Sequence, residues 1–154
     1  MENVAKIRGR MPEGAPWTIH EAACSDREGT MDVRIEDDGP SGFNCRVARP
    51  GEICDRSVRV ARLVDLVPEA TVVKIDVEGF EPEVLLGARR TLKTHQPILL
   101  AELTPAWSEA GPTGEAVALL EELGYRAHDI WSLYEGSVVQ ACTLRELFTR
   151  HAGN

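Results

Sequence analysis

Three acidic side chains follow two apolar runs in the middle of the chain, and their spacing is suited to chemistry on a hydroxyl group. Asp76 lies near the end of the run at residues 71–77 (TVVKIDV), Glu78 follows that run directly, and Glu102 lies near the end of the run at residues 97–103 (PILLAEL). If both runs are neighbouring parallel strands, their carboxyl ends meet where open α/β sheets bind ligands. A carboxylate there could accept a proton from a substrate hydroxyl or orient the hydroxyls of a sugar. Asp76, Glu78 and Glu102 are therefore the predicted catalytic residues.

Structural explanations for the charged residues nearby stay open. Glu81 and Glu83 fall in the first turn of the helix expected next, where the helix dipole stabilises negative charge by about 0.3–1 kcal/mol. Asp76 could satisfy loop amides without any catalytic task. Lys74 lies inside the strand, where we expect it to pair with a carboxylate because an unpaired buried ammonium is costly. Three carboxylates could hold a hard cation, but no further ligand is evident, and no metal site is predicted.

The elements that must position these residues alternate between strand and helix. Residues 71–77 are β-branched with little alternation, which is typical of a strand covered on both faces. Gly79 suits a tight turn, and a helix is expected at residues 81–94 with Pro82 in its first turn. Residues 97–103 are expected to form a second buried strand. This alternation predicts right-handed crossovers and a mostly parallel sheet with helices on both faces.

The remaining elements are predicted from hydrophobic periodicity and turn residues. On the N-terminal side, we expect a helix at 2–11, strands at 17–24, 30–35 and 57–63, a mobile surface loop at 37–56, and a short helical turn at 65–70. On the C-terminal side, we expect a helix at 113–123, a strand at 125–131, and a helix at 143–151 capped by Thr143. Trp107 and Trp131 follow or end strands and could stack on a sugar or aromatic substrate, although core or rim packing is the more common role of such residues.

Composition and charge exclude several classes of protein. A chain of 154 residues fits one compact domain. The formal net charge of −8 argues against a general nucleic-acid surface, and the pair Arg89–Arg90 is expected on a solvated helix face. No apolar stretch approaches the roughly 20 residues that span a bilayer, and the N-terminus lacks a secretory pattern. The predicted compartment is the cytoplasm, where the four cysteines stay reduced, and their spacing does not suggest zinc.

The run KIDVEGFEPEVLLGARRTL, followed by PILLAEL, closely resembles the FkbM family of S-adenosylmethionine-dependent methyltransferases. The family's KIDVEG-type turn corresponds to residues 74–79, its V-L-x-G-A helix to residues 84–88, and its Pro-initiated strand to residues 97–102. Upstream, EAACSDREGTMDV at residues 21–33 looks like the family's A-x-S-D-x-x-G segment. The similarity spans most of the chain.

The resemblance implies a fold, a cofactor and a reaction. The implied fold is a Rossmann-like, mostly parallel sheet of the class I methyltransferase type. The implied reaction moves the methyl group of S-adenosylmethionine to a hydroxyl of a sugar or natural product, mainly through positioning. Asp76 would act as base or orienter, while Glu78 and Glu102 would shape the acceptor pocket. Ala22 and Ala23 match the position that flanks the adenine ring of the cofactor in folds of this kind.

One part of the family pattern is missing from the sequence. The glycine-rich cofactor loop and the acidic residue that binds the ribose have no counterpart here. The chain is therefore expected to represent the C-terminal two-thirds of one methyltransferase domain, with apolar faces and an open sheet edge exposed. The alternative function is a non-catalytic remnant or assembly subunit that associates with itself or with a partner through that edge. A nicotinamide-dependent oxidoreductase is disfavoured because no dinucleotide fingerprint is present.

Overall fold

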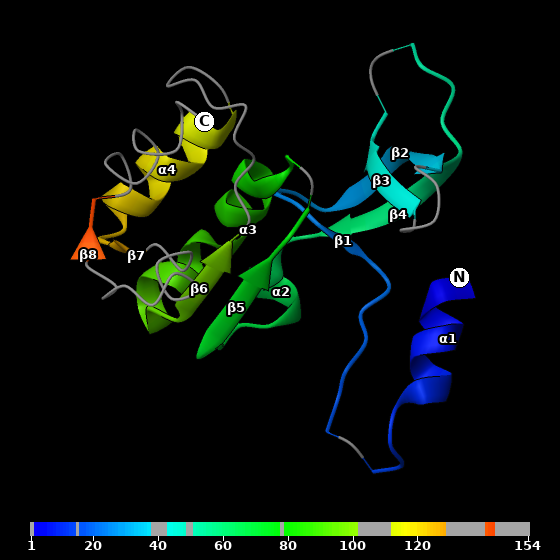
Figure 1. Cartoon of the computed structure of the whole chain (residues 1–154), viewed down its shortest axis with the longest axis horizontal. Helices are drawn as coiled ribbons and strands as arrows, with labels where there is room; N and C mark the ends of the chain where they lie inside the picture. The colour runs from blue at the N-terminus through cyan, green and yellow to red at the C-terminus, as the bar shows by residue number, and fades with distance from the viewer. Residues whose placement is uncertain are drawn as a thin grey trace, which may run out of the picture.

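The computed structural model describes residues 2–14, 16–37, 43–48, 51–77, 79–101, 112–128 and 141–143. It shows a mixed α/β fold with three small sheets (Figure 1). The helices are α1 (Glu2–Arg10), α2 (Leu63–Leu66), α3 (Glu81–His95) and α4 (Pro112–Glu122). In the described ranges, no helix combines the length and apolar character needed to cross a membrane.

The largest sheet has four strands in the order β1-β4-β2-β3. Its strands are β1 (Ala23–Cys24), β2 (Gly29–Asp37), β3 (Phe43–Val47) and β4 (Arg56–Ala61). β1 and β4 are parallel, whereas β2 runs antiparallel to both β3 and β4. The expected strand at 17–24 is thus reduced to its last two residues. The parallel pairing that was expected throughout occurs here only between β1 and β4.

The predicted loop at residues 37–56 contains β3, so the expectation that it lacks regular structure is wrong for residues 43–47. Phe43 pairs with Asp37 and Val47 pairs with Val33, which makes β3 the second strand of a hairpin with β2. The sequence of β3, FNCRV, has only five residues with polar ones near its centre, so it shows no clear hydrophobic period. The strand is stabilised by backbone pairing with a longer neighbour, which local periodicity does not reveal.

The second sheet is the strand–helix–strand unit that was expected from the sequence. β5 (Val72–Ile75) and β6 (Ile98–Ala101) are parallel, and α3 connects them. Their register pairs Val72 with Ile98 and Ile75 with Ala101, so both strands end at the same level. The carboxyl ends of the two strands therefore lie at one edge, as the sequence predicted.

The core lies between one face of this sheet and the helices α3 and α4. Three residues at helical spacing on α3 are completely buried, and they are Leu85, Ala88 and Leu92. Ala116 and Leu120 of α4 meet them in the same cluster. The helix α3 ends at Gln96, which adopts a left-handed conformation and donates side-chain hydrogen bonds to the carbonyl oxygens of Leu92 and Leu123.

Arg89 and Arg90 lie on the exposed face of α3, as expected. Arg89 also forms an ion pair with Glu122 of α4. This contact adds to the apolar packing between the two helices.

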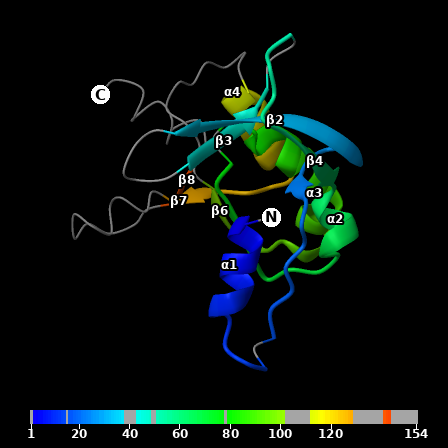
Figure 2. The same ribbon diagram turned by 90° about the vertical axis from the view of Figure 1, so that its right-hand side faces the viewer.

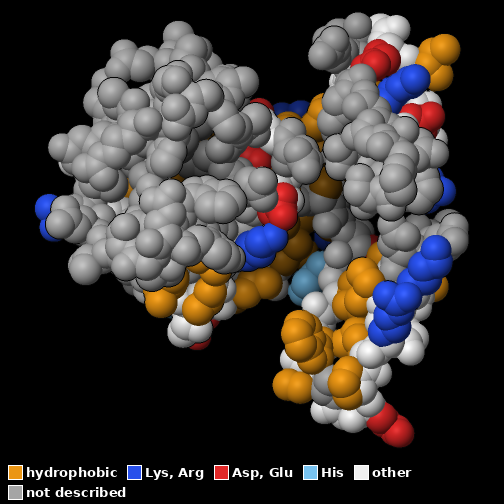
Figure 3. Space-filling model, viewed as in Figure 1, with side chains coloured by type: hydrophobic (Ala, Val, Ile, Leu, Met, Phe, Trp, Pro, Cys, Tyr) orange, Lys and Arg blue, Asp and Glu red, His pale blue; other side chains and the backbone are white. Residues whose placement is uncertain are grey.

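The opposite face of β5 and β6 is exposed, and the prediction that both strands are buried on both faces is wrong. Val72, Ile98 and Leu100 are 56%, 67% and 46% exposed, whereas Ile75 on the other face is buried. The two faces differ because α3 and α4 cover only one of them. In the view of Figure 3, hydrophobic side chains gather on the lower part of the molecule.

The N-terminal helix α1 lies to one side of the other helices (Figures 1 and 2). An ion pair of 2.8 Å joins Arg8 of α1 to Glu21 in the extended segment that follows. Trp17 in that segment is exposed. At the other end of the chain, β7 (Ala127–His128) and β8 (Ala141–Cys142) form a small antiparallel sheet. The helix predicted at 143–151 lies outside the described residues, apart from Thr143.

Candidate active site

A cavity of about 340 Å³ opens at the carboxyl end of β5. It lies where the ends of β1 and β5 meet the first turns of α2 and α3. Its lining residues are Cys24, Leu63, Val73, Lys74, Ile75, Asp76, Val77 and Val84. The walls are mainly aliphatic, and two charged side chains lie among them. Cavities that bind small molecules have this composition, and the volume falls at the lower end of their range.

Asp76 and Lys74 form an ion pair at this cavity. Lys74 Nζ donates to Asp76 Oδ2 over 2.7 Å, and the two residues share one face of the strand because they are two positions apart. The pairing expected for Lys74 is confirmed, but the side chains of Lys74 and Asp76 are 66% and 39% exposed rather than buried. A pair this exposed contributes less than about 1 kcal/mol to stability. Asp76 Oδ1 accepts no hydrogen bond from the described part of the chain.

A tight turn leads from Asp76 into α3. Gly79 has φ +95°, a conformation that residues with a Cβ rarely adopt. Its N–H donates to Oε1 of Glu81 over 3.1 Å, and the N–H of Phe80 donates to the carbonyl oxygen of Val77 over 3.2 Å. Glu81 is only 2% exposed. The sequence predicted a dipole role for Glu81, and its hydrogen bond to the turn was missed.

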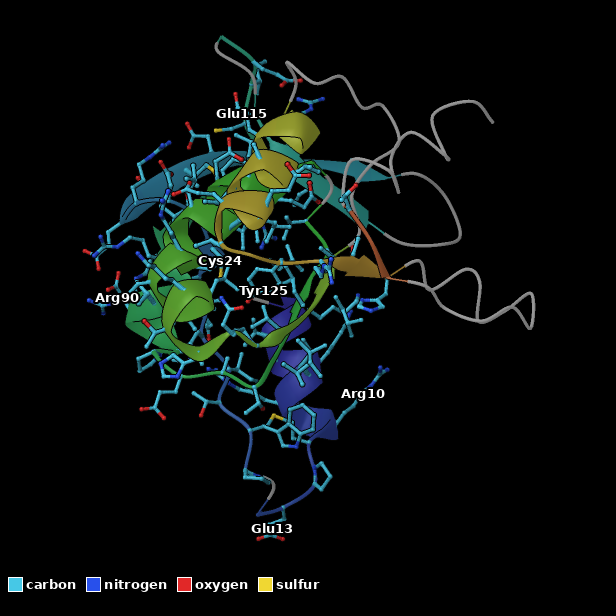
Figure 4. All side chains as sticks on the ribbon, turned by 90° about the vertical axis from the view of Figure 1, so that its left-hand side faces the viewer. Arg10, Glu13, Cys24, Arg90, Glu115 and Tyr125 are labelled. Atoms are coloured by element: carbon cyan, nitrogen blue, oxygen red, sulfur yellow. The ribbon has the colours of Figure 1, made fainter. Side chains whose placement is uncertain are left out.

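Glu83 lies one residue beyond Pro82 in the same helical turn and is half-buried. Its Oε2 is fully covered and has no hydrogen-bond partner among the described residues. Burial raises the pKa of the Glu83 carboxyl, and the nearby carboxylates of Asp26 and Glu115 raise it further. The glutamate's own backbone N–H and Arg27 oppose this shift. Figure 4 shows Glu115 in the first turn of α4.

Cys24 contributes a thiol to the cavity wall. It is half-buried beside α3 and packs against the hydrophobic core (Figure 4). Burial raises the pKa of this thiol, so the thiolate is scarce at neutral pH. By contrast, Cys54 is exposed. Both thiols are free.

Of the predicted site residues, Asp76 lies at the cavity and is described. Glu78 and Glu102 lie outside the described residues, so their convergence with Asp76 stays a prediction. Ala22 and Ala23 are half-buried directly before Cys24, but the cavity wall at this point is formed by Cys24 itself. No group of acidic, His or Cys side chains suited to a metal ion occurs within the described ranges.

The comparison with protein families decides the class of this domain. A family model described as the methyltransferase FkbM domain matches residues 18–127, which is more than half of the chain. The chain belongs to the FkbM methyltransferase family. The matched range includes every residue that lines the cavity. No curated protein and no solved structure was found to match the chain.

The FkbM resemblance recognised from the KIDVEG block is therefore confirmed. The block lies on β5 and the turn that follows, beside the cavity. In this methyltransferase domain, the most specific sequence motif therefore lies at the cavity beside β5.

Proposed function

We propose that this FkbM domain binds S-adenosylmethionine at the cavity beside β5 and transfers its methyl group to a hydroxyl of a sugar or natural product. The observation that supports this proposal is the position of Asp76 at the mouth of an aliphatic cavity, at the carboxyl end of a parallel strand. Sheets of the Rossmann type bind ligands at this edge. We further propose that β5, α3 and β6 form part of such a sheet.

The residues present fit the chemistry of the cofactor. Aliphatic side chains such as Leu63, Val73 and Val84 offer surfaces against which the apolar faces of an adenosine group pack. The carboxylate of Asp76 offers a hydrogen-bond acceptor at the opening. When bound, the sulfonium group supplies an electrophilic methyl group. The protein then needs to place an acceptor oxygen in line with that methyl group and to exclude water.

Asp76 is the residue that we assign to the acceptor. Its Oδ2 is held by Lys74, which leaves Oδ1 to accept a hydrogen bond from the acceptor hydroxyl. In this arrangement Asp76 orients the hydroxyl and receives its proton as the methyl group is transferred. Glu78 and Glu102 are proposed to complete the acceptor pocket, and Ala22 and Ala23 to flank the adenine.

Cys24 provides a test that requires no knowledge of the acceptor. The full chain is treated with N-ethylmaleimide in the absence and presence of S-adenosylmethionine, and labelling is followed by peptide mass spectrometry. We expect the cofactor to slow labelling of Cys24, because this thiol lines the cavity. Labelling of Cys54, which is exposed and does not line the cavity, should keep its rate and is the internal control. Equal rates at millimolar cofactor, together with no heat of binding by calorimetry, would refute the proposal.

A second candidate function is supported by the exposed face of β5 and β6. Val72, Ile98 and Leu100 form an apolar surface that two copies of the chain could cover by associating face to face. On this alternative the chain serves in assembly, without methyl transfer. Self-association without cofactor binding would favour it over the enzyme.

A further inference from the structure

The turn between Asp76 and α3 is held by a side chain that helix capping does not explain. The residue at the N-cap of α3, Phe80, makes no side-chain capping bond, and Pro82 has no N–H to satisfy. Glu81, the first residue of α3, directs its carboxylate backward and accepts the N–H of Gly79 over 3.1 Å. The bond therefore serves the turn rather than the amides of the helix.

The burial of Glu81 separates it from glutamates that only complement a helix dipole. Such residues act from the surface, as Glu115 does in the first turn of α4, where it is exposed. Glu81 is 2% exposed, and placing a carboxylate there is costly unless hydrogen bonds compensate for the lost water. The compensating bond fixes Gly79 in its left-handed conformation, three residues after Asp76.

The position of Asp76 depends on this turn. The pair with Lys74 is exposed and contributes little to holding the carboxylate in place. The backbone on the N-terminal side of Asp76 is fixed by pairing of β5 with β6. On the C-terminal side, two hydrogen bonds hold the turn: the N–H of Phe80 donates to the carbonyl oxygen of Val77, and the N–H of Gly79 donates to the carboxylate of Glu81.

We propose that Glu81 is a positioning residue of the methyltransferase site, which sets the turn so that Asp76 stays at the mouth of the cavity. This inference rests on the proposed function. Glu81 acts through the backbone and does not touch substrate or cofactor. Its oxygen is needed as a hydrogen-bond acceptor, so an amide at the same position should replace it.

The test compares Glu81→Gln, Glu81→Ala and the control Glu115→Ala in the full chain. Three quantities are measured: hydrogen exchange at the Gly79 amide by NMR, affinity for S-adenosylmethionine by calorimetry, and thermal stability. For Glu81→Ala we expect exchange at Gly79 to become about 10-fold faster and cofactor affinity to fall about 10-fold. Glu81→Gln should keep both within about threefold of the wild type because it retains the acceptor oxygen. Glu115→Ala should change neither.

Different results overturn different proposals. If the wild type binds no cofactor, the proposed function fails. If the wild type binds and Glu81→Ala binds equally well, the positioning role of Glu81 is wrong although the function stands. Equal losses in Glu81→Ala and Glu115→Ala would show a general dipole effect and would also overturn the inference. If Glu81→Ala does not fold, Glu81→Asp replaces it, because the shorter carboxylate keeps the charge but does not reach Gly79.

Discussion

A Cβ atom on Gly87 would lie 1.9 Å from the backbone carbonyl oxygen of Ser25, so α3 packs directly on the chain that leaves β1. Ser25 is buried, and its own N–H donates to the carbonyl oxygen of Ala61 at the end of β4. The close approach joins α3 to the four-stranded sheet. It also brings Val84 of α3 and Cys24 of β1 to the same cavity.

Replacement of Gly87 by alanine should therefore destabilise the domain. The new methyl group meets backbone, which cannot rotate away, and we expect a loss of about 2–3 kcal/mol in the free energy of unfolding by denaturant. Gly9→Ala is the matched control, because Gly9 lies in α1 and a Cβ atom there would meet nothing within 4 Å apart from the neighbouring backbone of its own helix. This second change should be neutral or slightly stabilising. Equal stability of the two variants would show that α3 does not pack against Ser25 in solution.

Removing the charge of Glu83 should stabilise the fold at neutral pH. Glu83→Gln is expected to raise the free energy of unfolding by up to about 1 kcal/mol at pH 7, because the carboxyl is only half-buried. The pKa of Glu83 is raised in the folded state, mainly by burial and then by Asp26 and Glu115, against the pull of Arg27. The stabilising contribution of its protonated form is thus present at low pH and is lost as pH rises through the raised pKa.

The advantage of Glu83→Gln should accordingly shrink as pH falls from 7 toward 4.5. Urea unfolding of both proteins across this range measures the difference. A stability advantage of Glu83→Gln that stays constant or grows on acidification would contradict the raised pKa of Glu83.

The two described free thiols should differ in reactivity. Burial raises the pKa of Cys24 and limits access to its sulfur, whereas Cys54 is exposed. We expect N-ethylmaleimide to label Cys54 at least about 10-fold faster than Cys24 at pH 7 in the absence of cofactor. The rate at Cys24 should keep rising as pH increases above the ordinary range of a thiol. Denaturation in urea should abolish the difference, and its persistence there would point to sequence effects instead.

Asp76→Asn should reduce methyl transfer strongly with little effect on stability. We expect turnover to fall about 100-fold or more, because the amide cannot receive the hydroxyl proton. The melting temperature should change by no more than about 2–4 °C, since the pair with Lys74 is exposed. Transfer of labelled methyl groups to a panel of hydroxylated metabolites provides the assay.

Asp65→Asn is the control for Asp76→Asn. Asp65 forms an ion pair of 2.7 Å with Arg62, but it does not line the cavity. The turnover of the Asp65→Asn variant should equal that of the wild type. Normal turnover with a large loss of stability in Asp76→Asn would make Asp76 a scaffold residue.

The exposed face of β5 and β6 should promote self-association. Light scattering after size exclusion is expected to show a mass that increases with protein concentration, and Ile98→Lys should reduce this increase. Leu86→Lys is the control, because Leu86 is similarly exposed but lies on α3. A wild-type chain that remains monomeric up to about 100 μM would exclude this surface as an association site.

The sequence predicted the elements around Asp76 well because they combine several local signals. The helix expected at 81–94 is observed at Glu81–His95, where helical periodicity and Pro82 agree. The strand at 71–77 is observed at Val72–Ile75. The predictions that failed concern features that depend on contacts between residues distant in sequence. The β-branched run could not show that one face of the strand is exposed, and the pairing of β3 with β2 has no local signal in the β3 sequence.

The site was predicted less completely than the fold. The carboxylate of Asp76 was recognised from its place after a strand, and its partner Lys74 from the cost of an unpaired charge. The role of Glu81 was missed because dipole complementation and a bond to the turn call for the same residue type at the same position. Only burial distinguishes them, and one sequence does not reveal it. Cys24 and Asp76 line the same cavity but lie at the ends of strands in different sheets, so no local sequence pattern indicates that they lie near each other.

The exposure of Trp17 gives the protein a built-in optical reporter. Indole emission shifts to shorter wavelength when the ring leaves water, and soluble quenchers then no longer reach it. A chain in which Trp107 and Trp131 are changed to phenylalanine would emit from Trp17 alone. Its spectrum would record, in real time and without a label, any molecule that covers the segment between α1 and β1.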